Sequence, residues 1–279
     1  MLKKLLATSA LCSVSLAAVA ADLPIKAPVY KAPAVAPFSW TGFYAGGNVG
    51  YSWGHSDLSF GSSADLGVDV GIPPLGLKPD GIIGGLQAGY NWQTNRNWVF
   101  GIETDFQWSG QKDSTVGGGD FDFEGTSGSF SYSAHSKLAW MGTLRGRVGF
   151  VPDTMPRTMF YGTGGLAYGR VKTSLSASVI CDNCGNEGEG FSAQLFASQS
   201  KTKVGFAVGA GVESAFADRW TWKVEYLYVD LGSVSGTMAA NISCVTDISG
   251  FCPSATSLNY SNKFTDNILR VGLNYKFSP

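Results

Sequence analysis

The sequence has no marked excess of charge of either sign. It contains 20 Lys and Arg residues against 21 Asp and Glu residues, which gives a net charge of -1. A protein that binds nucleic acid usually carries a clear basic excess on the binding domain. The charge balance therefore argues against a nucleic-acid partner.

Long apolar runs are also scarce. The run from Leu5 to about Ala18 follows Lys3 and Lys4 and ends in small residues. It is shorter than the roughly 20 residues that a membrane-spanning helix needs, and the arrangement is typical of a cleaved secretory signal peptide. We expect residues 1–20 to be a signal peptide, residues 21–38 a Pro-rich periplasmic segment, and residues 39–279 a single domain.

The chain does contain stretches in which apolar and polar residues alternate with a period of two. In WTGFYAGGNVGYSWG (residues 40–54), Phe43, Val49 and Trp53 share one face, while Asn48 and Ser52 share the other. This period predicts a β-strand with two different environments. Seven more such stretches begin at Gly81, Trp98, Lys137, Met159, Lys203, Trp220 and Ile268.

One face of each stretch is free of charge. In the stretch from Lys137 this face begins at Leu138 and Trp140. The stretch from Met159 is ambiguous in phase, but its uncharged set includes Met159 and Tyr161. Either a soluble β-sandwich buries such a face, or an outer-membrane barrel turns it to lipid. The mean hydropathy of only +0.05 suits a barrel and is too low for a helical membrane protein.

Loop lengths and aromatic residues favour the barrel. Connections after the first, third, fifth and seventh stretches are long, about 25–30 residues, and the others are short, about 3–6, as in outer-membrane barrels. Aromatic residues gather at the two ends of the stretches, for example Trp98, Tyr161 and Trp220 at the short turns and Tyr51 and Trp108 at the other end. The sequence therefore predicts an all-β, eight-stranded antiparallel up-and-down transmembrane β-barrel with two aromatic girdles.

The opposite faces carry charges that an eight-stranded barrel would enclose. A charge in a narrow lumen is costly unless it is paired, so we expect a salt-bridged plug. Gating or acid–base chemistry by Glu103 and Asp105 is the alternative, but the near balance of signs favours neutralisation. The predicted lumen charge network comprises Glu103, Asp105, Arg145, Arg147, Glu213, Lys223, Glu225 and Arg270.

Several motifs resemble one family of bacterial proteins. FSWTGFYAGGNVGYSWG after a Pro-rich ADLP start, YGTGGLAYG, VGAGVESAFADRWTWKVEYLYVDLG and the closing LRVGLNYKF are similar to the small outer-membrane barrels of alphaproteobacteria, the RopB-like or twenty-five-kilodalton outer-membrane protein family. The resemblance implies an abundant surface antigen in the outer membrane, in contact with lipid and lipopolysaccharide and inserted by the barrel-assembly machinery. It also implies haem or host-surface binding for some members, and it supplies no catalytic residues. Members usually finish on an aromatic residue, whereas here Ser278 and Pro279 follow Phe277.

Four cysteines remain after the signal peptide: Cys181, Cys184, Cys244 and Cys252. An even number in an exported chain suggests disulfides, and three pairings exist. We favour the local pairing of Cys181 with Cys184 and of Cys244 with Cys252.

The expected outer loops hold few groups suited to catalysis or metal binding. In DFDFEG, Asp120, Asp122 and Glu124 have the spacing of half a calcium loop, but the twelfth position is Ser131 instead of Glu, so a hairpin extension is the better interpretation. His55 and His135 could serve as haem ligands or in a lipid A-modifying enzyme, but neither has a nucleophile, base and orienting acid together.

These observations predict a non-enzymatic barrel without a cofactor or bound metal. We expect its role to be envelope integrity and surface display. A small-solute pore, or a haem or host-ligand receptor, is the alternative, and a lipid A-modifying enzyme is a more remote one.

Overall fold

The computed structural model describes residues 38–60, 75–123, 126–182, 190–244 and 257–277, and all of its regular elements are β-strands. The expected signal peptide and nearly all of the Pro-rich segment lie outside the described residues. Within the described part, no helix is long and apolar enough to cross a membrane.

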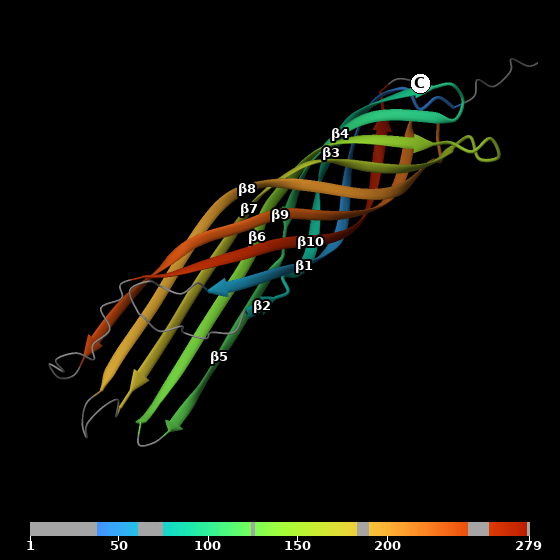
Figure 1. Ribbon diagram of the computed structural model, residues 1–279. Coiled ribbons are helices and arrows are strands. Elements are labelled where there is room, and N and C mark those ends of the chain that lie inside the picture. The colour runs from blue at the N-terminus through green and yellow to red at the C-terminus, as the bar shows by residue number, and fades with distance from the viewer. Residues whose placement is uncertain (1–37, 61–74, 124–125, 183–189, 245–256, 278–279) are drawn as a thin grey trace, which may run out of the picture. The chain divides into compact units, whose positions relative to one another are not determined.

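Eight antiparallel strands form a closed ring (Figure 1). Their order around the ring is β1, β3, β4, β6, β7, β8, β9 and β10, and β1 closes the ring by pairing with both β3 and β10. The predicted eight-stranded antiparallel barrel is therefore confirmed. The strands are β1 (Gly42–Phe60), β3 (Asp80–Thr94), β4 (Trp98–Ser109), β6 (Thr126–Phe150), β7 (Thr158–Cys181), β8 (Phe191–Ala215), β9 (Trp220–Cys244) and β10 (Ser257–Lys276).

The alternation in β1 has the predicted direction. Phe43 and Val49 are 63% and 59% exposed on the outside of the barrel, whereas Asn48 and Ser52 are 9% and 0% exposed inside it. A soluble protein would do the reverse, because its apolar side chains would leave water. The outer surface is therefore suited to lipid.

The predicted direction of β7 is wrong. Met159 and Tyr161 are 0% and 5% exposed and face the lumen, while Phe160 and Leu166 face outward. The sequence predicts that the uncharged set faces lipid, because Arg170 lies on the opposite face. Arg170 is exposed near the middle of β7, opposite Trp140 of β6 at the edge of the apolar band, so it does not exclude the rest of its face from lipid. Tyr161 is consequently not part of an aromatic girdle.

A β-bulge also reverses one end of β6. The pairing of β6 with β7 shifts register between Leu138 and Trp140, because one extra residue is inserted there. Leu138 is thereby fully buried in the lumen, although its even position predicts the outer face. On the other side of the bulge, Leu144 and Val148 are exposed on the outside as expected.

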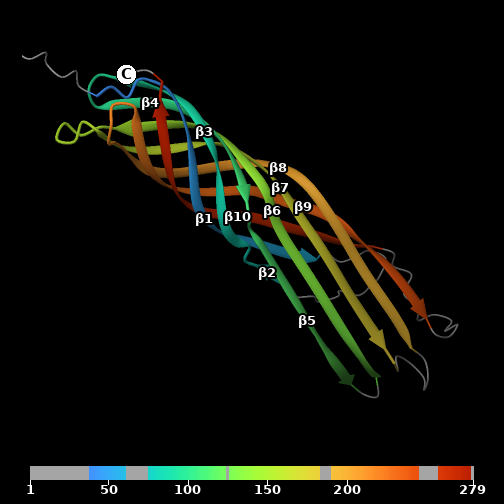
Figure 2. The same ribbon diagram turned by 180° about the vertical axis from the view of Figure 1, so that it is seen from behind.

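Much of the predicted outer-loop sequence is strand. Strands β6 to β9 continue far beyond the ends of β3 and β4, and two further strands, β2 (Leu75–Leu77) and β5 (Lys112–Phe123), pair with β1 and β6 in this region (Figures 1 and 2). Strands β4 and β5 pair with the same edge of β6, one after the other. Where the pairing of β4 with β6 ends, β5 becomes the neighbour of β6. Ser, Thr and Gly on both faces of these extensions hide the two-residue period from sequence analysis. We call this end the long-strand end and the other the short-turn end.

Candidate functional site

The charged residues predicted for the lumen lie together at one level of it. Alternation along each strand turns them inward, and each is at most 3% exposed. They come from five strands: Glu103 and Asp105 from β4, Arg145 and Arg147 from β6, Glu213 from β8, Lys223 and Glu225 from β9, and Arg270 from β10. We call this set the charge layer.

Glu103 lies at the centre of the charge layer. Its Oε1 accepts hydrogen bonds from Lys223 Nζ and Arg145 Nη2, each at 2.7 Å. Its Oε2 accepts one from Tyr44 Oη at 2.8 Å and one from Arg147 Nη1 at 3.3 Å. Strand β4 is not a neighbour of β9 in the ring, so the bond to Lys223 crosses the lumen.

A second set of contacts completes the layer. Arg145 Nη1 donates to Glu225 Oε1 at 3.0 Å, again across the lumen from β6 to β9. Arg270 joins Glu225 to Asp105, with its Nε 2.7 Å from Glu225 Oε2 and its Nη2 2.8 Å from Asp105 Oδ2. Arg147 reaches Glu213, whose other oxygen accepts hydrogen bonds from Thr221 and Asn274. Every member of the charge layer therefore has a partner of opposite sign.

The layer has four acids and four bases, so it is neutral as a whole. Low-dielectric surroundings strengthen these pairs, but they also make an unpaired charge expensive. Loss of one partner from such a pair costs about 3–5 kcal/mol, because the other charge stays buried. The charge layer thus spans the lumen with groups whose stability depends on one another.

Apolar side chains fill the lumen on both sides of the charge layer. On the short-turn side, Trp40 packs with Val99, Val151, Met159 and Tyr161. Towards the long-strand end, a larger cluster contains Ile83, Leu138, Met141, Ala167, Val171, Ala207, Leu227, Val229, Leu231, Val234, Phe264 and Ile268. An eight-stranded barrel has room for little more than its own side chains, as this filling illustrates.

Sequence analysis missed several polar lumen residues. Asp266 is fully buried beside Ser52 and Gln111, whose Nε2 lies 3.0 Å from Asp266 Oδ2. Asp266 has the same inward phase as Arg270, so the alternation extended four residues towards the N-terminus would have found it. Gln111 had no such signal, because it enters the lumen from the short break between β4 and β5.

Part of the lumen wall is polar but unpaired within the protein. Both amide atoms of Gln107 are buried without a hydrogen bond to any described residue, as are Asp105 Oδ1 and Arg270 Nη1. Buried polar groups without protein partners are usually satisfied by bound water. We therefore expect ordered water next to the charge layer on its Gln107 side.

Two of the four candidate disulfide cysteines, Cys181 and Cys244, lie at the tip of the long-strand end. Cys181 ends β7 and is disulfide-bonded. Cys244 ends β9, while Cys184 and Cys252 lie outside the described residues. The specific pairing therefore stays a prediction.

The acidic motif forms no calcium loop in its described part. Asp120 and Asp122 lie in β5, paired with Ser129 and Ser127 of β6, while Glu124 lies outside the described residues. In this segment β5 and β6 pair as the two strands of a hairpin extension. Across the described residues, no three His, Cys, Asp or Glu side chains gather as metal ligands would.

The two histidines point away from each other. Ser56 Oγ and Ser136 Oγ meet across the lumen at 3.4 Å. His55 and His135 are the preceding residues in β1 and β6, so each faces outward on its own side of the barrel and is exposed. This geometry does not allow both to bind the same haem.

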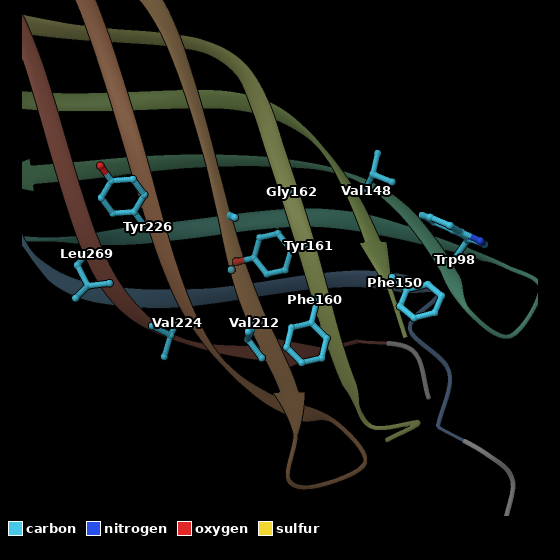
Figure 3. Close-up of a pocket in the computed structure, with 12 residues that line it drawn as sticks. Trp98, Val148, Phe150, Phe160, Tyr161, Gly162, Val212, Val224, Tyr226 and Leu269 are labelled. Atoms are coloured by element: carbon cyan, nitrogen blue, oxygen red, sulfur yellow. The ribbon is translucent and has the colours of Figure 1, made fainter. Parts of the chain in front are cut away.

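A shallow groove on the outer surface offers no reactive group. It has a volume of about 580 Å³ and lies over Gly162, where the absence of a side chain leaves space between its neighbours. Figure 3 shows Phe160, Val212 and Val224 around it. Its surface is almost wholly apolar, as expected for contact with an acyl chain.

Comparisons with known proteins agree with this architecture. The outer membrane protein beta-barrel domain family matches residues 9–277. The 31 kDa outer-membrane immunogenic protein of Brucella melitensis is 37% identical over 99% of this chain and 100% of its own length. The 22 kDa outer membrane protein of Rhizobium leguminosarum is 30% identical over 88% of this chain and 82% of its own, and the 25 kDa outer-membrane immunogenic protein of Brucella canis is 30% identical over 97% and 95%.

Solved structures of other barrels are more distant. The outer membrane protein OprG from Pseudomonas aeruginosa has a TM-score of 0.45 at 13% identity and covers 86% of this chain and 97% of its own. Ail of Yersinia pestis has a TM-score of 0.32 at 16% identity, with 84% of this chain and 99% of its own covered. From the family match and the close relatives, the chain belongs to the outer membrane protein beta-barrel family of small alphaproteobacterial barrels, and its location is the cell outer membrane.

Proposed function

We propose that the protein is a closed, non-enzymatic barrel that contributes to envelope integrity and presents its long-strand end at the cell surface. The observation that carries this proposal is the charge layer. Its cross-lumen pairs, such as Lys223 with Glu103 and Arg145 with Glu225, occupy the path that a solute would have to take.

The proposal includes an orientation. Outer-membrane barrels keep short turns in the periplasm and long connections outside. By this rule the short-turn end, with Trp40 at its mouth, faces the periplasm, and the extended strands β6 to β9 face outward. Contact with host surfaces or with haem would then involve the long-strand end, although the positions of His55 and His135 do not favour a shared haem.

Conductance tests the closed lumen directly. The purified full-length protein, inserted into a planar lipid bilayer, should give no steady ion conductance, whereas a sixteen-stranded porin measured in parallel should. The ion pairs of the charge layer are buried, so salt screens them little, and the layer has no net charge. The barrel should therefore stay closed across moderate changes of salt concentration. Large and stable channels would contradict the proposal and support a small-solute pore.

The envelope role needs a cellular test. A strain without the gene should become more sensitive to detergent while its uptake of small solutes stays at the parental rate. Complementation with the parental gene serves as the control. A defect confined to solute uptake would favour the pore, and a change confined to the lipid A mass spectrum would favour an enzyme.

A further inference from the structure

Four exposed basic residues share the outer surface where the barrel passes into the long-strand end. Lys112 of β5 is paired with Lys137 of β6, and Lys137 is paired with Lys172 of β7. All three are exposed, so three lysines occupy successive positions of one row across three strands. Arg170 lies two residues from Lys172 on the same face of β7. We call these four residues the basic patch.

Like charges in this arrangement repel each other. Side chains directly opposite on neighbouring strands have Cβ atoms about 4.5–5.5 Å apart, and like charges there are destabilising. Among the described residues, no carboxylate forms an ion pair with any of the four, and Arg170 Nε donates only to Ser200 Oγ, at 2.9 Å. This contrasts with the charge layer, in which each base has a carboxylate. Asp80 of β3 is opposite Lys112 in the register, but it accepts a hydrogen bond from Tyr51 and forms no ion pair with the lysine. The basic patch therefore keeps an excess of positive charge that can neutralise an anion from outside the protein.

The aromatic residues next to the patch fix its level relative to the membrane. Trp140 lies opposite Arg170 and has ring contacts with Phe106, at 5.7 Å, and with Tyr168, at 6.3 Å. Such rings lie at the boundary between acyl chains and headgroups. Arg170 is level with Trp140, and the three lysines of the basic patch lie one row further from the apolar band. In Figure 1 this is where β5 begins and continues beside β6. We therefore expect the headgroups of the surrounding lipid at this level.

We propose that the basic patch binds the anionic groups of lipopolysaccharide in the outer leaflet. Lysine ammonium groups supply point charges and the Arg170 guanidinium supplies paired donors, which together suit phosphate or carboxylate groups on a sugar. The exposed apolar residues below the patch, including Leu144 and Leu166, would contact the acyl chains of the same molecule. The inference rests on the outward orientation of the long-strand end.

A charge-matched pair of variants tests the proposal. In the first, Lys112→Gln, Lys137→Gln and Lys172→Gln are combined. In the control, Lys201→Gln, Lys203→Gln and Lys263→Gln remove the same charge from β8 and β10 at the same end of the barrel. All six positions are at least partly exposed, so both variants should fold, and the difference in gel mobility between heated and unheated protein checks this.

The readout is binding of lipopolysaccharide to the delipidated full-length protein in mild detergent. The patch variant should lose on the order of 100-fold in affinity, because each basic group near an anionic lipid surface strengthens binding several-fold. The control variant and the parent should bind alike. Dephosphorylated lipopolysaccharide and inorganic phosphate serve as further probes; tight binding of inorganic phosphate alone would assign the patch to a free anion.

Unchanged lipopolysaccharide binding in the patch variant, or an equal loss in the control, would overturn the proposal. Labelling intact cells with a membrane-impermeant amine reagent separates this result from a failure of the assumed orientation. If the lysines react from outside and lipopolysaccharide binding is still unaffected, only the lipid site is wrong. If they react only after the outer membrane is opened, the orientation itself is wrong.

Discussion

Removal of the Glu103 carboxylate should destabilise the barrel more than almost any other single change of charge. Glu103→Ala takes acceptors from Lys223, Arg145 and Arg147 and leaves the charge layer with an excess of one positive charge. Loss of one partner from a buried pair typically costs about 3–5 kcal/mol. We expect the free energy of unfolding to fall by that amount.

Reversible urea unfolding in lipid vesicles, followed by tryptophan fluorescence, measures this change. Asp218→Ala is the matched control, because Asp218 pairs with Arg157 at 3.1 Å but its side chain is 88% exposed. An exposed pair of this kind contributes about 0–1 kcal/mol. The contrast between the two variants isolates the effect of burial from that of the charge itself.

A double variant gives a sharper test. Glu103→Ala combined with Lys223→Ala removes one charge of each sign, so it should cost less than the sum of the two single changes by about 0.5–3 kcal/mol. Additive costs would show that the two groups do not depend on each other. A cost for Glu103→Ala as small as that for Asp218→Ala would refute the view that the charge layer stabilises the barrel.

Three further predictions concern the barrel wall. Val49→Lys places a charge on the lipid face and should cost about 2–4 kcal/mol, which would reduce the fraction of assembled barrel in cells; unchanged assembly would tell against this orientation of β1. Leu138→Ala should lower the free energy of unfolding by about 2–5 kcal/mol in vesicles, clearly more than Leu144→Ala on the lipid face, since the bulge buries only the former. Gly85→Ala should impair folding, because the added Cβ would lie 1.9 Å from a carbonyl oxygen of β4. At Gly162 an added Cβ would have no atom within 4 Å, so Gly162→Ala should fold normally. Equal yields of folded protein for the two variants would contradict this prediction.

Local alternation was enough to predict most of the barrel. Charged residues identified the inner face of β4, β6, β9 and β10, because an unpaired charge cannot face lipid. The same rule failed for β7, where Arg170 lies at the edge of the apolar band and the inner face carries no charge. It failed again at Leu138, since a bulge inserts one residue and leaves no clear mark in the sequence.

The candidate site was predictable in its membership but not in its connections. All eight residues of the charge layer could be named from strand phase alone, yet the expected partners were on neighbouring strands. The structure adds pairs across the lumen, such as Arg145 with Glu225. It also adds Tyr44, whose hydroxyl bonds to Glu103 and whose inward direction follows from the phase of β1.

The sequence by itself determined the strand period, the number of strands in the ring and, outside β7 and the bulged end of β6, which face of a strand is turned to lipid, because these follow from the alternation of residues along one strand. Only the tertiary structure decided which residues meet, since the stagger between strands brings together residues that are far apart in sequence. Glu103 and Lys223 meet across the lumen for this reason. Lys112, Lys137 and Lys172 form one row on the outside for the same reason, and no local pattern in the sequence relates them.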